Sequence, residues 1–355
     1  MQTILITGGA GFAGSNLAIL LKQKYPSYQV ICMDNLKRRG SELNLQKLKE
    51  LEIEFIHGDT RHKSDFDQIK KPVSCIIDAA AEPSVLAGQD GNTDYLIATN
   101  FNGTVNTLEF ALKDRANFIF LSTSRVYPIR AIEEIQVTEA ATRFEIAAKQ
   151  NMPGISQDGI SENFPLQGAR SLYGSTKLAS ELMVEEYNDT FGLKTVINRC
   201  GVLAGPHQMG KIDQGVVVLW MARHFWKGSL SYIGYGGNGK QVRDLLHIND
   251  LFSLVDMQVH QPGKFNGDTY NIGGSGKISA SLVELTGLCR EITGNTIAIT
   301  SIPETRKADI KLYLSDCSKI RKVIQWEPQR SVKEILQDIY DWIRDNEAKL
   351  KPILS

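Results

Sequence analysis

Four glycines near the start of the chain, at positions 8, 9, 11 and 14, constrain its fold more than any other feature. They follow the apolar stretch 3–7, and the leucines of residues 14–24 recur at helical spacing directly after them. A strand that turns sharply into a helix favours glycine, which permits the tight turn and a close approach to the backbone. Because the helix N-terminus attracts anions, we expect the first 35 residues or so to form a βαβ unit that holds a dinucleotide.

The rest of the first 200 residues alternates between β-branched runs and amphipathic stretches, which predicts parallel strands joined by crossover helices. We therefore predict an α/β fold, a Rossmann-type doubly wound parallel sheet with a smaller C-terminal α/β lobe that binds the substrate. The boundaries are 1–200 and 201–350, with part of 242–265 returning to the first domain. The predicted strands are 3–7, 30–34, 53–57, 75–79, 118–122 and 195–199, the main helices are 14–24, 95–115 and 176–188, and 346–355 is expected to be a loose tail.

Composition excludes several classes of protein. Forty basic residues balance 40 acidic ones, so no overall charge favours nucleic acid or a membrane surface. No apolar run approaches the ~20 residues of a membrane span. The five cysteines are widely spaced and set among apolar residues, which fits reduced thiols in a cytoplasmic protein, and no metal site is expected.

A carboxylate at the end of the second strand indicates the kind of dinucleotide. Asp34 follows Gly14 by 20 residues, where it can accept hydrogen bonds from ribose hydroxyls and repel a 2′-phosphate. This favours NAD over NADP, although the positive charges of Lys37, Arg38 and Arg39 could bind the 2′-phosphate of NADP.

Tyr173 and Lys177 are candidate catalytic residues because their spacing places them on one face of a helix. The lysine ammonium favours the phenolate, which lowers the tyrosine pKa toward a range where it can take a hydroxyl proton. Thr123 follows the fifth strand and is expected at the carboxyl edge of the sheet, where its hydroxyl can orient a substrate alcohol.

Together, the glycine motif, the strand-end threonine and YxxxK resemble the extended short-chain dehydrogenase/reductase family of nucleotide-sugar enzymes, the NAD-dependent epimerases and dehydratases. The resemblance covers nearly the whole chain and implies tightly bound, recycled NAD. Asp78 departs from it, since members often carry His there. The cofactor residues that it implies are Gly8, Gly11, Phe12, Ala13, Gly14, Asp34, Asn35, Asp59, Thr60, Ala79, Ala80, Ala81, Asn100, Tyr173 and Lys177.

The residues after Thr123 bear on the reaction. Dehydratases of the family carry Asp-Glu there, whereas this chain has Ser124 and Arg125, which leaves epimerisation, oxidation/reduction or decarboxylation. The sequence most resembles the CDP-paratose (CDP-tyvelose) 2-epimerase group. The segments that carry this likeness are 213–216, 237–247, 270–274 and an insertion between Tyr127 and Tyr173 that includes Thr142, Arg143 and Phe144.

This resemblance implies an isomerase that inverts C2 of a CDP-hexose. Tyr173 would remove the proton of the 2-hydroxyl, and a transient 2-keto sugar would be reduced on its opposite face, which regenerates NAD. The expected substrate contacts are Thr123, Gln214, Val216, Arg243 and Arg306, with the arginines on the diphosphate. A UDP-sugar 4-epimerase, a dehydrogenase/reductase that releases its cofactor and a non-catalytic member stay open as alternatives. The family also suggests a homodimer, or a dimer of dimers, built from helices 95–115 and 176–188.

Overall fold

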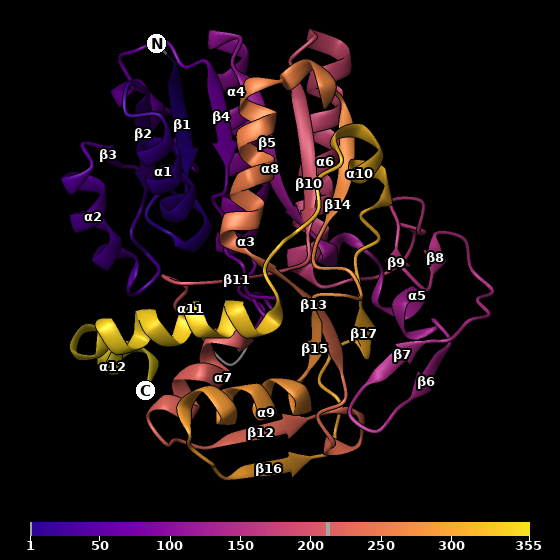
Figure 1. The fold of residues 1–355 in the computed structure, drawn as a ribbon. Coiled ribbons are helices and arrows are strands. Elements are labelled where there is room, and N and C mark those ends of the chain that lie inside the picture. Colours follow the sequence, from indigo (N-terminus) through magenta and orange to yellow (C-terminus); the bar gives the residue numbers. More distant parts are fainter. Residues whose placement is uncertain (1, 211–213) are drawn as a thin grey trace. The chain divides into compact units, whose positions relative to one another are not determined.

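A computed structural model describes residues 2–210 and 214–355, and the chain divides into two compact units (Figure 1). The first comprises Met1–Thr123, Leu172–Arg199 and Leu251–Tyr270. The second comprises Ser124–Ser171, Cys200–Asp250 and Asn271–Ser355. Residues 251–270 lie beyond position 200 but belong to the first unit, whereas residues 124–171 lie before it but belong to the second. A domain boundary at residue 200 stays a prediction.

The first unit is built on a seven-stranded sheet with the strand order β14-β10-β5-β4-β1-β2-β3. Its central pairs β2–β3, β1–β2, β1–β4 and β4–β5 are parallel, which confirms the doubly wound fold class. The strands are β1 (Thr3–Thr7), β2 (Gln29–Asp34), β3 (Glu54–His57), β4 (Cys75–Asp78), β5 (Asn117–Thr123), β10 (Thr195–Cys200) and β14 (Asp268–Ile272).

Helices flank this sheet, and α6 (Leu172–Phe191) extends beyond the predicted 176–188 at both ends. The stretch predicted as one helix over 95–115 is α3 (Asp94–Ile97) and α4 (Gly103–Asp114), joined by a π-helical turn over Ala98–Asn102. A core of buried side chains from the sheet, α4 and α6 includes Leu5, Phe118 and Val184. The remaining helices of this part are α1 (Phe12–Lys24), α2 (Leu45–Glu50), α6 (Leu172–Phe191) and α8 (Ile248–His260).

The second unit mixes small sheets and helices. One sheet has the order β11-β13-β15 with β17 also paired to β13, and β12 pairs with β16, β6 with β7 and β8 with β9. The strands are β6 (Val137–Glu139), β7 (Phe144–Ile146), β8 (Ile155–Ser156), β9 (Gly159–Ile160), β11 (Val202–Ala204), β12 (Leu230–Ile233), β13 (Val242–His247), β15 (Ser279–Ser281), β16 (Ile299–Ile302) and β17 (Leu312–Tyr313). The helices are α5 (Ile129–Glu133), α7 (Val216–Phe225), α9 (Leu282–Thr293), α10 (Ser318–Ile324), α11 (Val332–Asp345) and α12 (Glu347–Leu354).

The expectation of a loose C-terminal tail is wrong. Residues 347–354 form α12, and its side chains Leu350 and Leu354 are buried. Burial of two leucines favours the ordered helix despite Pro352 within it.

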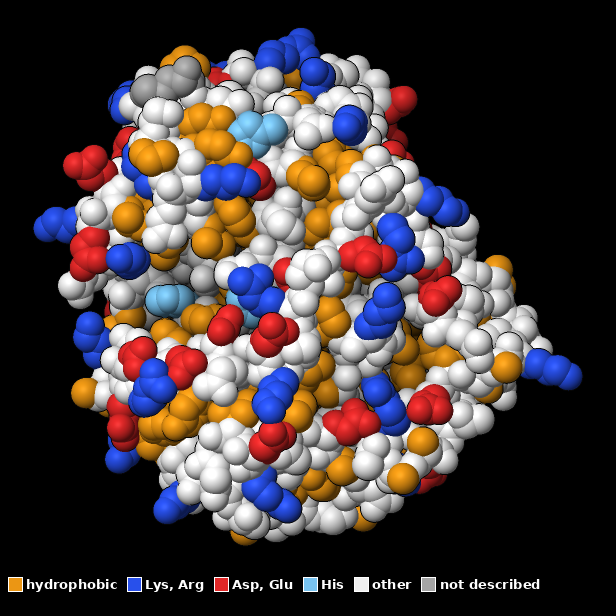
Figure 2. Space-filling model, in the orientation of Figure 1, with side chains coloured by type: hydrophobic (Ala, Val, Ile, Leu, Met, Phe, Trp, Pro, Cys, Tyr) orange, Lys and Arg blue, Asp and Glu red, His pale blue; other side chains and the backbone are white. Residues whose placement is uncertain are grey.

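The surface and the thiols agree with the composition. On the face seen in Figure 2, basic and acidic side chains are interspersed. All five cysteines are buried thiols that form no disulfide. Within the described residues, no helix is long and apolar enough to cross a membrane, and no group of acidic, histidine or cysteine side chains is arranged to hold a metal ion. The cytoplasmic location stays a prediction.

Candidate active site

The glycine turn between β1 and α1 is closely packed. Gly8 has a φ of +63°, in the left-handed region that favours glycine. A Cβ on Gly14 would lie 2.2 Å from the Gly8 carbonyl oxygen, and a Cβ on Gly9 would lie 2.4 Å from the Cβ of Cys32. These three positions therefore need glycine for the fold of the turn itself.

Gly11 differs from them and bears on whether a dinucleotide fits. A Cβ there would meet only the Gly8 carbonyl oxygen, at 3.2 Å, so the glycine leaves open space at the start of α1. Among the described residues, none caps this helix with its side chain, and its first turn holds no acidic group. The N–H groups that begin at Phe12 and Ala13 thus suit the pyrophosphate of a dinucleotide.

Asp34 ties the glycine turn to the end of β2. Its carboxylate accepts hydrogen bonds from the N–H groups of Ala10, at 3.1 Å, and Leu36, at 2.8 Å. Burial raises the pKa of Asp34, and these backbone hydrogen bonds act against the rise. The carboxylate therefore holds the turn in place, and its contact with a ribose stays a prediction.

A polar cluster follows β3. The Asn35 amide donates to Asp59 at 2.9 Å, and Arg61 donates to the same carboxylate at 2.7 Å. Burial acts to raise the pKa of Asp59, but the hydrogen bonds from Arg61 and Asn35 outweigh it and hold that pKa at about 2. Thr60 is buried and accepts a hydrogen bond on its carbonyl from Asn106 of α4 at 2.9 Å.

The alanine segment after β4 lies against the glycine turn. The N–H groups of Ala79 and Ala80 both donate to the Thr7 hydroxyl at 3.2 Å, and a Cβ on Gly8 would touch Ala79 and Ala80 at 2.9 Å. Residues 79–81 and the glycine turn thus form one surface at the carboxyl ends of β1 and β4.

Asn100 lies in the π-helical turn and is fully buried. Its amide donates to the Glu82 carbonyl at 3.1 Å and to the Thr176 hydroxyl at 3.2 Å, and it accepts from the Glu82 N–H at 2.7 Å. It therefore positions the segment after the alanines against α6, and a direct cofactor contact stays a prediction.

The three candidate catalytic residues belong to the first unit. Thr123 ends β5, and Tyr173 and Lys177 occupy the first two turns of α6. Each is at most 9% exposed. The Lys177 ammonium lies 3.8 Å from the centre of the Phe120 ring, a cation–π contact that fixes it against β5. Thr123 thus lies at the carboxyl end of β5, and Lys177 of α6 packs against the same strand.

A buried ion pair behind these residues escaped the sequence analysis. Arg199 of β10 donates to both carboxylate oxygens of Glu181 in α6, with the shortest contact at 2.7 Å, and Glu181 also accepts a hydrogen bond from Ser122 of β5. Their side chains are only 1% and 5% exposed. The spacing along the helix could have indicated Glu181, since it follows Lys177 by four residues, just as Lys177 follows Tyr173.

Apart from Thr123, the predicted substrate residues belong to the second unit. Arg243 directs three N–H groups at Asp309, the Ile310 carbonyl and the Val242 carbonyl, at 2.7–2.8 Å. Arg306 is exposed. Gln214 and Val216 flank the start of α7, and the Gln214 side-chain oxygen is buried without a hydrogen-bond partner. Asp213, from the segment that suggested the 2-epimerase group, lies outside the described residues.

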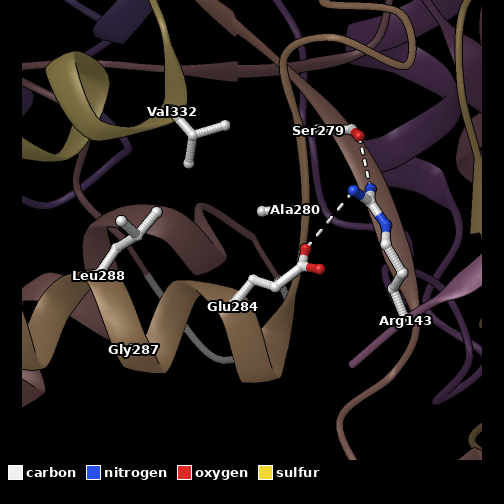
Figure 3. Close-up of a pocket in the computed structure, with 7 residues that line it drawn as sticks. All are labelled: Arg143, Ser279, Ala280, Glu284, Gly287, Leu288 and Val332. Atoms are coloured by element: carbon white, nitrogen blue, oxygen red, sulfur yellow. Dashed lines mark hydrogen bonds and ion pairs between the residues drawn. The ribbon is translucent and has the colours of Figure 1, made fainter. Parts of the chain in front are cut away.

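A shallow pocket of about 430 Å³ lies elsewhere in the second unit (Figure 3). Arg143 from the insertion bonds there to Ser279 at 2.6 Å and lies 3.7 Å from Glu284. Leu288 and Val332 line its apolar side. Its polar groups are paired with one another and none of the predicted site residues lines it, so we do not regard it as the active site.

Comparison with known proteins adds to this geometry. A sequence profile of the NAD dependent epimerase/dehydratase family matches residues 4–273. A CDP-paratose 2-epimerase of Salmonella typhi is 34% identical over 347 residues, which span 96% of this chain and 98% of the relative. A UDP-glucose 4-epimerase of Erwinia amylovora is 27% identical over 97% of this chain and 98% of the relative. Among solved structures, the chain is similar to DesIV, a dTDP-glucose 4,6-dehydratase from Streptomyces venezuelae with NAD and TYD bound. The two are 26% identical and superpose with a TM-score of 0.79, over 99% of this chain and 100% of DesIV.

Proposed function

Because the chain belongs to the NAD dependent epimerase/dehydratase family, we propose that it is a nucleotide-sugar epimerase that inverts C2 of a CDP-linked hexose. NAD is the cofactor of the family. The proposal for C2 and for CDP depends on the 34% identity to a CDP-paratose 2-epimerase along almost the whole of both chains.

One observation argues for epimerisation over dehydration, although dehydratases are also among the relatives. Ser124 and Arg125 occupy the positions that carry Asp-Glu in dehydratases of the family. Arg125 donates to the Ala308 carbonyl at 2.9 Å, and neither side chain offers a carboxyl group. The acid and base that loss of water needs are thus missing from these two positions.

The residues of the first unit would hold the cofactor. The N–H groups at the start of α1 would bind the pyrophosphate, Asp34 the ribose, and residues 79–81 would line the surface beside the glycine turn. When bound, NAD supplies the oxidising and then the reducing equivalent for a sugar carbon.

The protein itself handles the proton. The Tyr173 phenolate would accept the proton of the sugar 2-hydroxyl and later return it, and the Lys177 ammonium one helical turn away would stabilise the phenolate. The Thr123 hydroxyl would orient the sugar hydroxyl. Burial of all three side chains strengthens these interactions because it excludes water.

The second unit would hold the nucleotide diphosphate. Arg243 is fixed by Asp309 and two carbonyls, which leaves two of its five N–H groups for a phosphate. We propose Arg306, Gln214 and Val216 as further contacts. Holding the diphosphate while the sugar turns would let both faces of the keto sugar be presented in succession.

The decisive experiment follows the sugar-ring protons by NMR after the purified protein is mixed with CDP- and UDP-hexoses without added cofactor. Inversion at C2 of a CDP-hexose, with no net NADH, is the expected result. Inversion at C4 of a UDP-hexose would replace the proposal with a 4-epimerase, and stoichiometric NADH would indicate a dehydrogenase. No turnover of any CDP-hexose would contradict the proposal.

A further inference from the structure

Asp78, the residue that departs from the usual histidine of the family, ends β4 in a fully enclosed position. It is 1% exposed. One carboxyl oxygen lies against the hydroxyl of Thr7, its neighbour in register on β1, and the other lies 3.0 Å from the hydroxyl of Thr104 in α4. An ionised carboxylate at such a site needs compensating donors or charges.

The hydrogen atom of Thr7 can be assigned by counting donors. Its hydroxyl oxygen accepts the N–H groups of Ala79 and Ala80, so its own hydrogen is left to donate to Asp78 Oδ1. Asp78 thus holds, through Thr7, the alanine segment beside the glycine turn.

The same count at Thr104 gives a different result. Its hydroxyl lies 3.0 Å from Asp78 Oδ2 and 3.1 Å from the Asn100 carbonyl oxygen, and it has a single hydrogen to donate. If Asp78 were ionised, both neighbours would be acceptors and one of the two contacts would lack a hydrogen. A proton on Oδ2 satisfies both, because Asp78 then donates to Thr104 and Thr104 donates to Asn100.

We infer that Asp78 is a protonated, uncharged carboxyl group that positions the cofactor-binding segments and leaves the charge of Lys177 to act on Tyr173. The neighbours on the adjoining elements are Thr7, Phe120, Thr104 and Lys177, and the lysine is the charged one among them.

The electrostatic balance agrees with the hydrogen count. Burial raises the pKa of Asp78, and the charge of Lys177 and the two threonine hydroxyls act against it. The ammonium of Lys177 contacts the face of Phe120, the register neighbour of Asp78 on β5. A negative charge on Asp78 would weaken the effect of the lysine on Tyr173, so the neutral form serves the proposed proton transfer.

Infrared spectroscopy tests the protonation directly. The C=O stretch of a protonated carboxylic acid, identified by its shift in heavy water, is expected near neutral pH in the wild type and is expected to be lost in Asp78→Asn. The matched control is Asp256→Asn, which removes a buried carboxylate paired with Lys24 at 2.7 Å and should leave the band unchanged. Identical bands in the wild type and Asp78→Asn would overturn the inference.

Stability gives a second measurement. Asn at position 78 reproduces the donor and acceptor of the protonated acid, so Asp78→Asn should melt within about 4 °C of the wild type. Asp78→Ala, which leaves Thr7 and Thr104 without this partner, should melt at a clearly lower temperature. An Asp78→Asn variant that fails to fold would also contradict a neutral Asp78.

The link to catalysis rests on the proposed function and has its own measurement. The acid limb of the pH–rate profile should be the same in Asp78→Asn as in the wild type. A shift of about one unit or more toward lower pH would mean that the substitution had removed a negative charge. If no sugar nucleotide is turned over, the proposed function fails while the infrared result still decides the state of Asp78.

Discussion

Tyr173 is the residue on which the proposed chemistry depends most. It has a phenol hydroxyl and is almost completely buried, and it lies on the same helix as Lys177. Replacing it with Phe removes only the hydroxyl. We expect Tyr173→Phe to lower kcat by about 10²-fold or more while NAD stays bound, because it removes the base and leaves the cofactor surface intact. Turnover by NMR and bound NAD by absorbance check this. Tyr187→Phe on the same helix is the control, and retained activity in Tyr173→Phe would refute the assignment.

Asp59 offers a prediction for pH. Hydrogen bonds from Arg61 and Asn35 outweigh the effect of burial and hold its pKa at about 2, against about 3.9 in an unfolded chain. A lowered pKa stabilises the fold fully above about pH 4, and this stabilisation is lost as the pH falls toward 2. Asp59→Asn should therefore be less stable than the wild type at neutral pH, by about 1 to 2 kcal/mol.

Denaturant unfolding at several pH values measures this difference. It should shrink as the pH falls from 4 toward 2, since the wild type alone loses the charged hydrogen bonds there. The exposed Asp67→Asn serves as the control. A difference that stays constant over this range would contradict the role given to Arg61.

At the scale of elements, α6 is joined to β5 and β10 by the pair of Glu181 and Arg199 with Ser122. Glu181→Gln takes from the buried Arg199 the carboxylate that pairs with it, so we expect this change to cost about 3 kcal/mol of the free energy of unfolding. Replacing both, as in Glu181→Leu with Arg199→Met, should cost less than the sum of the single changes. Urea unfolding in a double-mutant cycle measures this.

An exposed ion pair supplies the comparison for that cycle. Lys47 and Glu50 are 46% and 50% exposed, and Glu50→Gln should change the stability by less than about 0.5 kcal/mol. Equal effects of Glu50→Gln and Glu181→Gln would mean that the buried pair does not anchor α6.

The elements also show what the sequence can predict. The strands β1 to β5 and β10 agree with the prediction within one residue at each end. Of these, β1, β2, β4 and β5 are buried almost throughout, and a buried parallel strand reads as a continuous apolar run. The π-helical turn over Ala98–Asn102 and the helix α12 did not follow from local pattern. The first packs Asn100 against α6, and the second buries Leu350 and Leu354.

The candidate site divides in the same way. The glycine turn and the helix that carries Tyr173 and Lys177 were predictable because short spacings carry their signal, while the roles of these residues stay predictions. Arg243 also bonds to Asp309, 66 residues away, and Asp78 also bonds to Thr104, 26 residues away. Such pairs depend on how the chain folds in three dimensions, which spacing along the sequence does not reveal.

At the scale of the whole molecule, the predicted homodimer can be tested on α6. Leu182 is 55% exposed and Phe191 is 45% exposed, and Ile97 of α3 is 40% exposed. Large exposed apolar side chains favour association. We expect Leu182→Glu to yield monomers in light scattering, because it would place a charge in the interface. Ile302→Glu in the second unit is the control, and an unchanged mass in Leu182→Glu would exclude this interface.

The way in which the chain alternates between its units has a consequence for biosynthesis. The first unit needs Leu251–Tyr270, which carries most of α8, and Asp256 in this segment pairs with Lys24 near the end of α1. These two residues are more than 200 positions apart in the sequence, so the ribosome adds Asp256 long after Lys24. Until residue 270 has emerged, the nascent first unit therefore lacks one helix and one strand. During this time the apolar face of its sheet is exposed, so chaperones can bind it and it can aggregate.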